Sequence, residues 1–208
     1  MKREEKNMLT RAKIQKGALA EFSRNGYIGA SVNNICSEVD ISKGIIYHYY
    51  RDKDELYIAC VRQCFEQLTE YLEAMMKIRT GSQDQQLETY FDARAEFFWK
   101  NPVYLPIFIE SIFNPSILLL PEIEVCRKEF REQSVRFLTE ILGNCRLRAG
   151  NSLQEVIEDF TMYMDFFNAR FKLLLQNGAA EPAVFERHER ECHRQLDILL
   201  HGILENGL

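Results

Sequence analysis

The chain has 208 residues, of which 46% are hydrophobic and 27% are charged, and it includes six cysteines. This apolar content excludes a disordered chain and is enough for one large or two small domains. The formal net charge is −5, which excludes a uniformly basic surface.

The charge is unevenly distributed along the chain. Up to Arg51 there are nine lysines and arginines against five acidic residues, a balance of +4 that leaves −9 for the remainder. A basic segment of this kind suits phosphate contacts, which need local positive charge rather than positive charge overall.

No segment has the features of a membrane span or a secretory signal. Five of the first six residues are charged, and no apolar run approaches the roughly 18 residues that a spanning helix needs. We therefore expect a cytoplasmic protein with no membrane partner.

The six cysteines are scattered without a C-x-x-C pair, which indicates reduced thiols rather than a disulfide framework. Sensing through a reactive thiol stays open. Cys60 with Cys64, and His188 with Cys192, have the i, i+4 spacing that can hold a soft metal. Neither pair has a companion set of ligands, so we expect no metal and no cofactor.

In chain order, the first elements are three short helices. Ile14, Ala18 and Phe22 share one face of a helix over residues 10–25, which ends at Asn25-Gly26. Ser31 is an N-cap candidate for a second helix. Residues 40–42 form a tight turn, and Ser42 is expected to cap a third helix that ends near Tyr50.

The rest of the chain is also predicted to be helical. Asp52 and Glu55 have capping-box spacing at the start of a long helix. The expected helices are 52–79, 83–100, 122–142, 153–176 and 183–204, with a proline-punctuated segment over residues 102–121. We predict an all-α protein of about nine helices, with a three-helix domain over 1–51, a connecting helix over 52–79 and a C-terminal helical domain over 80–208.

Three short helices with a tight turn before the third are typical of a helix-turn-helix. The strings SVNNIC at 31–36 and VDISKGIIYHYYRDKDEL at 39–56, preceded by AEF at 20–22 and NGY at 25–27, closely resemble the N-terminal signature of the tetracycline-repressor (TetR/AcrR-type) family. The likeness covers roughly the first 57 residues. It implies a dimeric regulator of transcription that places its third helix in the major groove of double-stranded DNA.

The third helix should turn polar groups outward. Lys43, Tyr47 and His48 can donate to phosphates or bases, and Gly44 permits close approach to DNA. The resemblance adds Ser31 and Lys53 as backbone contacts and Asn33 as a base contact. The expected DNA-binding residues are Ser31, Asn33, Ser42, Lys43, Gly44, Ile45, Tyr47, His48 and Lys53.

Two positions depart from the family pattern. Asp40 stands in a turn where the family commonly has glycine, although aspartate tolerates the left-handed conformation. Ile45 stands where a small or hydroxylated residue is frequent, and it could contact a thymine methyl. Tyr50, in contrast, is expected to be a packing residue.

The helix over 153–176 carries an apolar arc too wide for one neighbour to cover. We expect it to pair, together with the last helix, with the same helices of a second subunit, as the family implies. The expected interface residues are Phe160, Met164, Phe167, Phe171, Cys192, Leu196, Leu199 and Ile203. Such a homodimer would bind a roughly palindromic operator.

Aromatic residues gather in the middle helices, where we expect a cavity for a small effector that is apolar or amphipathic. The expected ligand residues are Arg94, Phe97, Phe98, Tyr104, Phe108, Glu110, Phe113, Tyr163 and Phe166. For each of these residues an ordinary core or surface role is the alternative. Asp165 falls beside Asn168 and Lys172 on the helix, so we expect it on the solvated face.

The leading hypothesis is a repressor that an effector releases from its operator. One alternative is a DNA-binding module regulated by a protein partner, and another is an all-α small-molecule-binding protein with an incidental helix-turn-helix. No motif for a nucleophile, a phosphate loop or a two-histidine metal helix is present, so we do not expect an enzyme.

Overall fold

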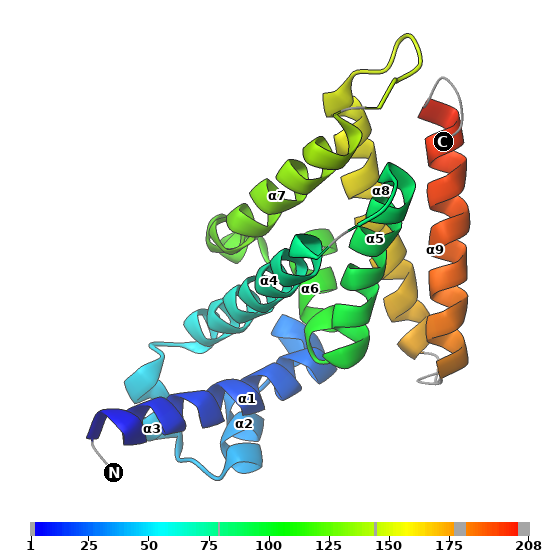
Figure 1. The fold of residues 1–208 in the computed structure, drawn as a ribbon. Helices are drawn as coiled ribbons and strands as arrows, with labels where there is room; N and C mark the ends of the chain where they lie inside the picture. The colour runs from blue at the N-terminus through cyan, green and yellow to red at the C-terminus, as the bar shows by residue number, and fades with distance from the viewer. Residues whose placement is uncertain (1–2, 79, 144, 177–181, 204–208) are drawn as a thin grey trace. The chain divides into compact units, whose positions relative to one another are not determined.

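The computed structural model describes residues 3–78, 80–143, 145–176 and 182–203, and the regular structure of these ranges is helical (Figure 1). The elements are α1 (Arg3–Gly29), α2 (Val32–Val39), α3 (Lys43–Tyr49), α4 (Lys53–Lys77), α5 (Gln83–Lys100), α6 (Tyr104–Phe113), the 3₁₀ turn η1 (Ile117–Leu119), α7 (Leu120–Leu142), α8 (Leu153–Gln176) and α9 (Pro182–Ile203). These nine α-helices confirm the predicted fold class.

Two predicted boundaries were wrong. α1 begins seven residues earlier than expected and runs past Asn25, with a break at Gly26 (φ 65°, ψ 177°) instead of an end there. The proline-punctuated segment contains a complete helix, α6. Pro106 fits its first turn because the first N–H groups of a helix have no intrahelical acceptor.

The chain divides into two compact units. The first unit comprises Met1–Glu66 and Asn101–Arg127, and the second comprises Gln67–Lys100 and Lys128–Leu208. The division falls within α4, between α5 and α6, and within α7, so that α6 belongs to the same unit as α1, α2 and α3. The units follow contacts in space, whereas the ranges expected from the sequence follow chain order.

The core of the first unit forms where α1 packs against α2 and α6. Ile14, Ala18 and Phe22 are buried, as their i, i+4, i+8 spacing predicted. Gly17 lies between them, and a Cβ atom at this position would overlap Cγ1 of Val39 on α2. The small residue therefore sets how closely α2 approaches α1.

The turn between α2 and α3 has the geometry expected of a helix-turn-helix. Asp40 caps α2 in the left-handed conformation (φ 48°, ψ 57°), which confirms that aspartate serves where the family commonly has glycine. Ser42 occupies the N-cap position of α3, but its side chain makes no capping hydrogen bond, contrary to prediction.

In the second unit, α5 and α8 pack beside α9 (Figure 1). Phe91 of α5 stacks on Phe160 of α8 with ring centroids 5.9 Å apart. Polar contacts also link these helices: His193 of α9 lies 2.5 Å from Asp92 of α5. No single helix among those described is long and apolar enough to cross a membrane; α6 and residues 117–142 meet that test only as a pair bent by 93°.

The packing at Gly17 gives a stability prediction. Gly17→Ala should lower the free energy of unfolding by about 1–3 kcal/mol, because the added methyl must displace Val39 or α2 itself. Urea denaturation monitored by circular dichroism measures the change.

Gly44→Ala is the matched control, since a Cβ atom there would meet nothing within 4 Å. It should raise the free energy of unfolding by up to about 1 kcal/mol through helix propensity alone. Equal effects of the two substitutions would contradict the close approach of α2 to α1.

Candidate nucleic-acid interface

The helix α3 is anchored by few residues and exposes the others. Ile46 is 1% exposed in the small core, and Tyr50, which caps the helix, is also buried, as predicted. Lys43, Gly44, Ile45, Tyr47 and His48 are exposed. A helix of seven residues is not stable alone, so the first unit fixes α3 and presents these side chains together on one surface.

Gly44 on this surface serves no packing role within the chain. Glycine costs about 1 kcal/mol relative to alanine inside a helix, yet the space around the Gly44 Cα is open. The open space allows a large molecule to approach the backbone of α3. Lys43 lies beside it, with its ammonium 5.8 Å from the centre of the Tyr47 ring.

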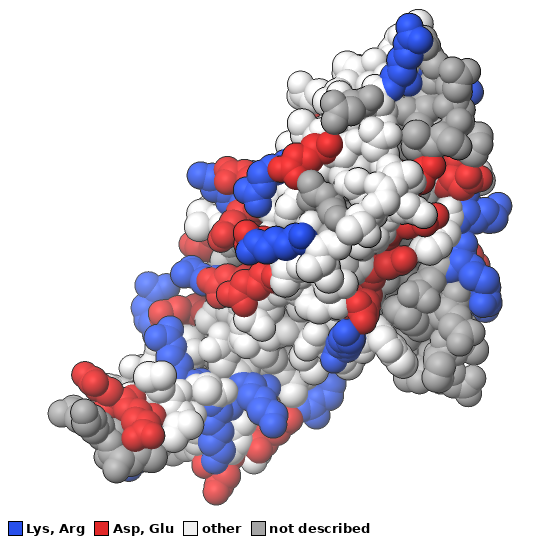
Figure 2. Space-filling model, viewed as in Figure 1, with Lys and Arg blue, Asp and Glu red and all other residues white. Residues whose placement is uncertain are grey.

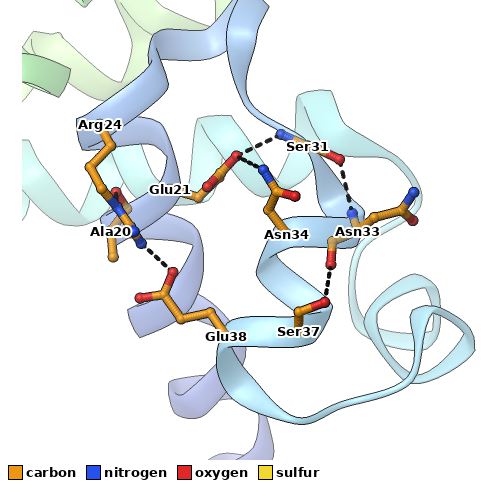
Figure 3. A network of polar contacts seen from close by, with 8 residues as sticks. All are labelled: Ala20, Glu21, Arg24, Ser31, Asn33, Asn34, Ser37 and Glu38. Carbon is orange, nitrogen blue, oxygen red and sulfur yellow. Dashed lines mark hydrogen bonds and ion pairs between the residues drawn. The ribbon is translucent and has the colours of Figure 1, made fainter.

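The start of α2 contributes a second polar group to the interface. Ser31 is the N-cap, as predicted, and its hydroxyl accepts a hydrogen bond from the Asn33 N–H at 3.2 Å. The Asn33 side chain is exposed and points away from the rest of the polar network (Figure 3). An asparagine in this position can reach a base edge in a groove.

A buried carboxylate holds this end of α2. Glu21 of α1 accepts hydrogen bonds from the Ser31 N–H at 2.9 Å and from the Asn34 side chain at 3.0 Å (Figure 3). Burial alone would raise the pKa of Glu21, but these hydrogen bonds outweigh it and lower the pKa below its ordinary value. Glu21 is therefore ionised at neutral pH, and sequence reasoning did not single it out.

Lys53 has an internal role as well as the DNA contact expected of it. Its ammonium donates to the carbonyl oxygen of Tyr27 at 2.8 Å and to that of Ala30 at 3.3 Å. The ammonium thus satisfies carbonyl oxygens at the end of α1, where the helix dipole favours a cation. A phosphate contact by Lys53 would have to share the ammonium with these carbonyls.

The charges around α3 are mixed. Arg51 is paired with Asp52 at 2.8 Å, and Arg24 forms an ion pair with Glu38 on the surface of α1 and α2. On the face shown in Figure 2, basic and acidic side chains also lie among one another along α1. The positive balance of the first 51 residues is thus dispersed, and Lys43 supplies charge at the interface itself.

The predicted effector residues are divided between the two units. Tyr104, Phe108, Glu110 and Phe113 belong to the first unit, whereas the remaining five residues belong to the second. Tyr104 and Phe108 are buried, but Phe113 is 49% exposed. Glu110 binds the backbone of α1: the Tyr27 N–H donates to both of its carboxylate oxygens at 3.0 Å.

The expected solvated position of Asp165 was wrong. Asp165 lies 3.1 Å from the guanidinium of Arg94, whose side chain is 1% exposed. The guanidinium also lies over the Phe130 ring, 5.2 Å from its centre. A buried cation needs an anionic partner, and the neighbouring helix α8 supplies it.

The other aromatic residues of the predicted effector set range from buried to exposed in the second unit. Phe97 and Phe98 are buried in the second unit, Tyr163 is partly buried, and Phe166 is 59% exposed. A groove of about 590 Å³ lies in this unit between α4 and α7, with Met76 and Phe137 among its lining residues. None of the predicted effector residues lines this groove.

The predicted interface residues also differ in exposure. Phe160, Phe167 and Leu196 are buried within their own chain, and Leu199 is partly buried. The side chains of Met164, Phe171, Cys192 and Ile203 lie outside the described part of the structure. Among the side chains of α8 and α9 that the structure describes, the large apolar ones that are exposed are Met162 (67%), Phe166 and Ile198 (51%).

Two of the described thiols are shielded from solvent. Cys60 and Cys64 are fully buried, and burial raises the pKa of both thiols well above the ordinary range. No group of three or more metal-ligating side chains occurs within the described ranges, which leave out the side chains of His188 and Cys192.

Residues 14–60 match the family model for bacterial regulatory proteins of the tetR family. The HTH-type transcriptional regulator UidR of Escherichia coli K12 is 30% identical over 129 residues, which are 61% of this chain and 65% of UidR. The biofilm operon icaADBC HTH-type negative transcriptional regulator IcaR of Staphylococcus epidermidis is 35% identical over 60 residues, 29% of this chain and 32% of IcaR. The chain thus spans less than two thirds of either relative.

Solved structures of regulators share the fold at low sequence identity. FadR from Bacillus subtilis, in complex with stearoyl-CoA, has a TM-score of 0.73 at 15% identity, over 89% of this chain and 97% of that one. The ketosteroid regulator KstR2 of Mycobacterium tuberculosis has a TM-score of 0.67 at 19% identity, over 95% and 96% of the two chains.

The buried carboxylate of Glu21 predicts a pH dependence of stability. Because the folded pKa lies below the unfolded one, the stabilisation is complete above the ordinary pKa of glutamate and is lost as the pH falls through the lowered value. Glu21→Gln keeps one acceptor, so it should cost about 1–3 kcal/mol at neutral pH. It should also remove this acid-dependent component in denaturation between about pH 7 and pH 3.

Glu38→Gln removes the same charge from a surface ion pair and should change the free energy of unfolding by less than about 1 kcal/mol. If the two variants lose stability equally and show the same pH profile, Glu21 does not hold α2 as described.

Proposed function

We propose that this chain, whose residues 14–60 match the family model for bacterial regulatory proteins of the tetR family, represses transcription by binding double-stranded DNA through α3. The exposed row on α3 is the observation that supports this proposal. Lys43, Tyr47 and His48 offer donors beside the open backbone of Gly44, while Ile46 anchors the helix from behind. This arrangement suits a major groove, where donors reach phosphates and base edges.

We further propose that the repressor is a homodimer in the cytoplasm and binds a palindromic operator. Met162 and Phe166 lie one turn apart on α8 and expose large apolar side chains, as Ile198 does on α9. Neighbouring exposed apolar residues, such as Met162 and Phe166, are typical of an interaction surface. Two copies related by a twofold axis would present two α3 helices to successive major grooves.

We also propose that a small apolar or amphipathic effector releases the DNA. The groove between α4 and α7 supports an amphipathic molecule, because Met76 and Phe137 are buried while charged side chains also line it. The stearoyl-CoA of the Bacillus subtilis FadR structure is a molecule of this kind. An effector acts only if it binds the DNA-free state more tightly than the DNA-bound state.

The DNA proposal predicts a loss of affinity in Lys43→Ala. Affinity for an operator, selected by the wild-type protein from random duplexes, should fall by about tenfold or more. The slope of log K against log salt concentration should also decrease by about 0.9 for each phosphate contact that is lost. Fluorescence anisotropy with labelled duplex measures both quantities.

Gly44→Ala separates DNA contact from stability, because it should stabilise the fold and still weaken operator binding by steric exclusion at the helix backbone. Wild-type affinity in both variants would refute the assignment of α3. If no duplex is enriched by the wild-type protein, the function itself is refuted.

The dimer proposal predicts that Met162→Glu with Phe166→Glu yields monomers in sedimentation velocity experiments at micromolar concentration, because four carboxylates would be buried at the shared surface. Ile78→Glu, which alters an exposed apolar residue outside α8 and α9, should leave the sedimentation coefficient unchanged. A dimer that persists in the double variant would place the interface elsewhere.

A further inference from the structure

The break in α1 creates the segment from which α2 begins. Gly26 combines a positive φ (65°) with an extended ψ (177°), and one further turn follows, in which the Ala30 N–H donates to the Gly26 carbonyl at 3.1 Å. Ser31, the N-cap of α2, comes next. Residues 26–30, the α1–α2 turn, therefore set the direction in which the chain enters the helix-turn-helix.

The carboxylate of Glu110 on α6 accepts hydrogen bonds from a backbone N–H of this turn. Both oxygens of Glu110 lie 3.0 Å from the Tyr27 nitrogen, and the Tyr57 hydroxyl donates to one of them at 3.1 Å. A Cβ atom at Gly26 would stand 3.0 Å from a Glu110 oxygen. Glycine is thus needed here both for its backbone conformation and for the approach of Glu110.

The first turn of α4 holds the opposite side. Lys53 binds the carbonyl groups of Tyr27 and Ala30, and its ammonium lies 4.7 Å from the centre of the Tyr27 ring. The Tyr27 hydroxyl donates to Asp54 at 2.6 Å, a bond that raises the pKa of Tyr27 to about 12. The phenol stays protonated at neutral pH and so keeps the proton that it donates to Asp54.

The two helices that bind the α1–α2 turn, α4 and α6, differ in their place along the chain. α4 follows α3 directly along the chain, whereas Glu110 belongs to α6, 83 residues from Tyr27. Hydrogen bonds to a charged acceptor are stronger than neutral ones and are lost beyond about 3.5 Å. A displacement of α6 by about 1 Å must therefore move the α1–α2 turn or break its bonds to Glu110.

We propose that Glu110 is a positioning residue that fixes α2 and α3 through the α1–α2 turn, so that the position of α6 sets how well the protein distinguishes its operator from other DNA. This inference rests on the proposed function in DNA binding. In this role the Glu110 carboxylate acts on α2 and α3 through the backbone N–H of Tyr27.

The test compares Glu110→Gln with Glu122→Gln, an exposed residue of α7 whose substitution removes the same charge. The readout is the ratio of affinities for the selected operator and for a scrambled duplex, at a temperature where circular dichroism shows both variants folded. Glu110→Gln should lower this ratio by about fivefold or more while binding to the scrambled duplex is kept, because only the matched site requires a fixed α3. Amide exchange at Tyr27 and in α2 should also accelerate.

If Glu110→Gln fails to fold, Tyr57→Phe replaces it in the test, because this substitution removes only the hydroxyl that orients the carboxylate. It should lower the ratio in the same direction by a smaller factor. A merely structural role would lower both affinities in proportion to the folded fraction and leave the ratio unchanged, and that result in either variant overturns the proposal. If the wild-type protein itself shows no preference for any duplex, the proposed function fails instead.

Discussion

The backbone break at Gly26 is the constraint on which the first unit depends, because it converts the end of a long helix into the entry to α2. Gly26 leaves the helical conformation, and Glu110 and Lys53 bind the two sides of the turn that follows. Backbone groups released from a helix need new partners when they are not in water. Here the partners come from two other helices, so one local break ties α1, α4 and α6 together.

The position of α3 depends on this anchoring. α3 has seven residues and cannot form alone, so Ile46 and the capping Tyr50 hold it to the core while the others face outward. Glu21 holds α2 in place, because its buried carboxylate accepts a hydrogen bond from the Ser31 N–H at the start of that helix. A rigid support presents Lys43, Tyr47 and Asn33 in one arrangement, which would lower the entropy lost in the proposed binding to DNA.

Buried and partly buried charges have different roles in the two units. In the first unit, Glu21 and Glu110 accept hydrogen bonds from backbone N–H groups, and at the N-terminus of α2 the helix dipole also favours the anion of Glu21. In the second unit, Arg94 and Asp165 pair between α5 and α8 beneath aromatic rings. Removal of one partner from such a pair leaves an uncompensated charge, so these four residues constrain the positions of their helices more strictly than apolar contacts do.

The sequence by itself determined most of the helices, though not α6, and it determined the α2–α3 turn and the outward row on α3, because these follow from local periodicity, capping and conformational preference. The bounds of α5 and α8, the left-handed Asp40 and the buried Tyr50 all agree with it. Only the tertiary structure decided the partners of Glu21, Glu110 and Asp165, since each partner lies on another helix and leaves no periodic trace. For the same reason, angular placement on an isolated helix assigned Asp165 to solvent, although a buried arginine on α5 was its partner.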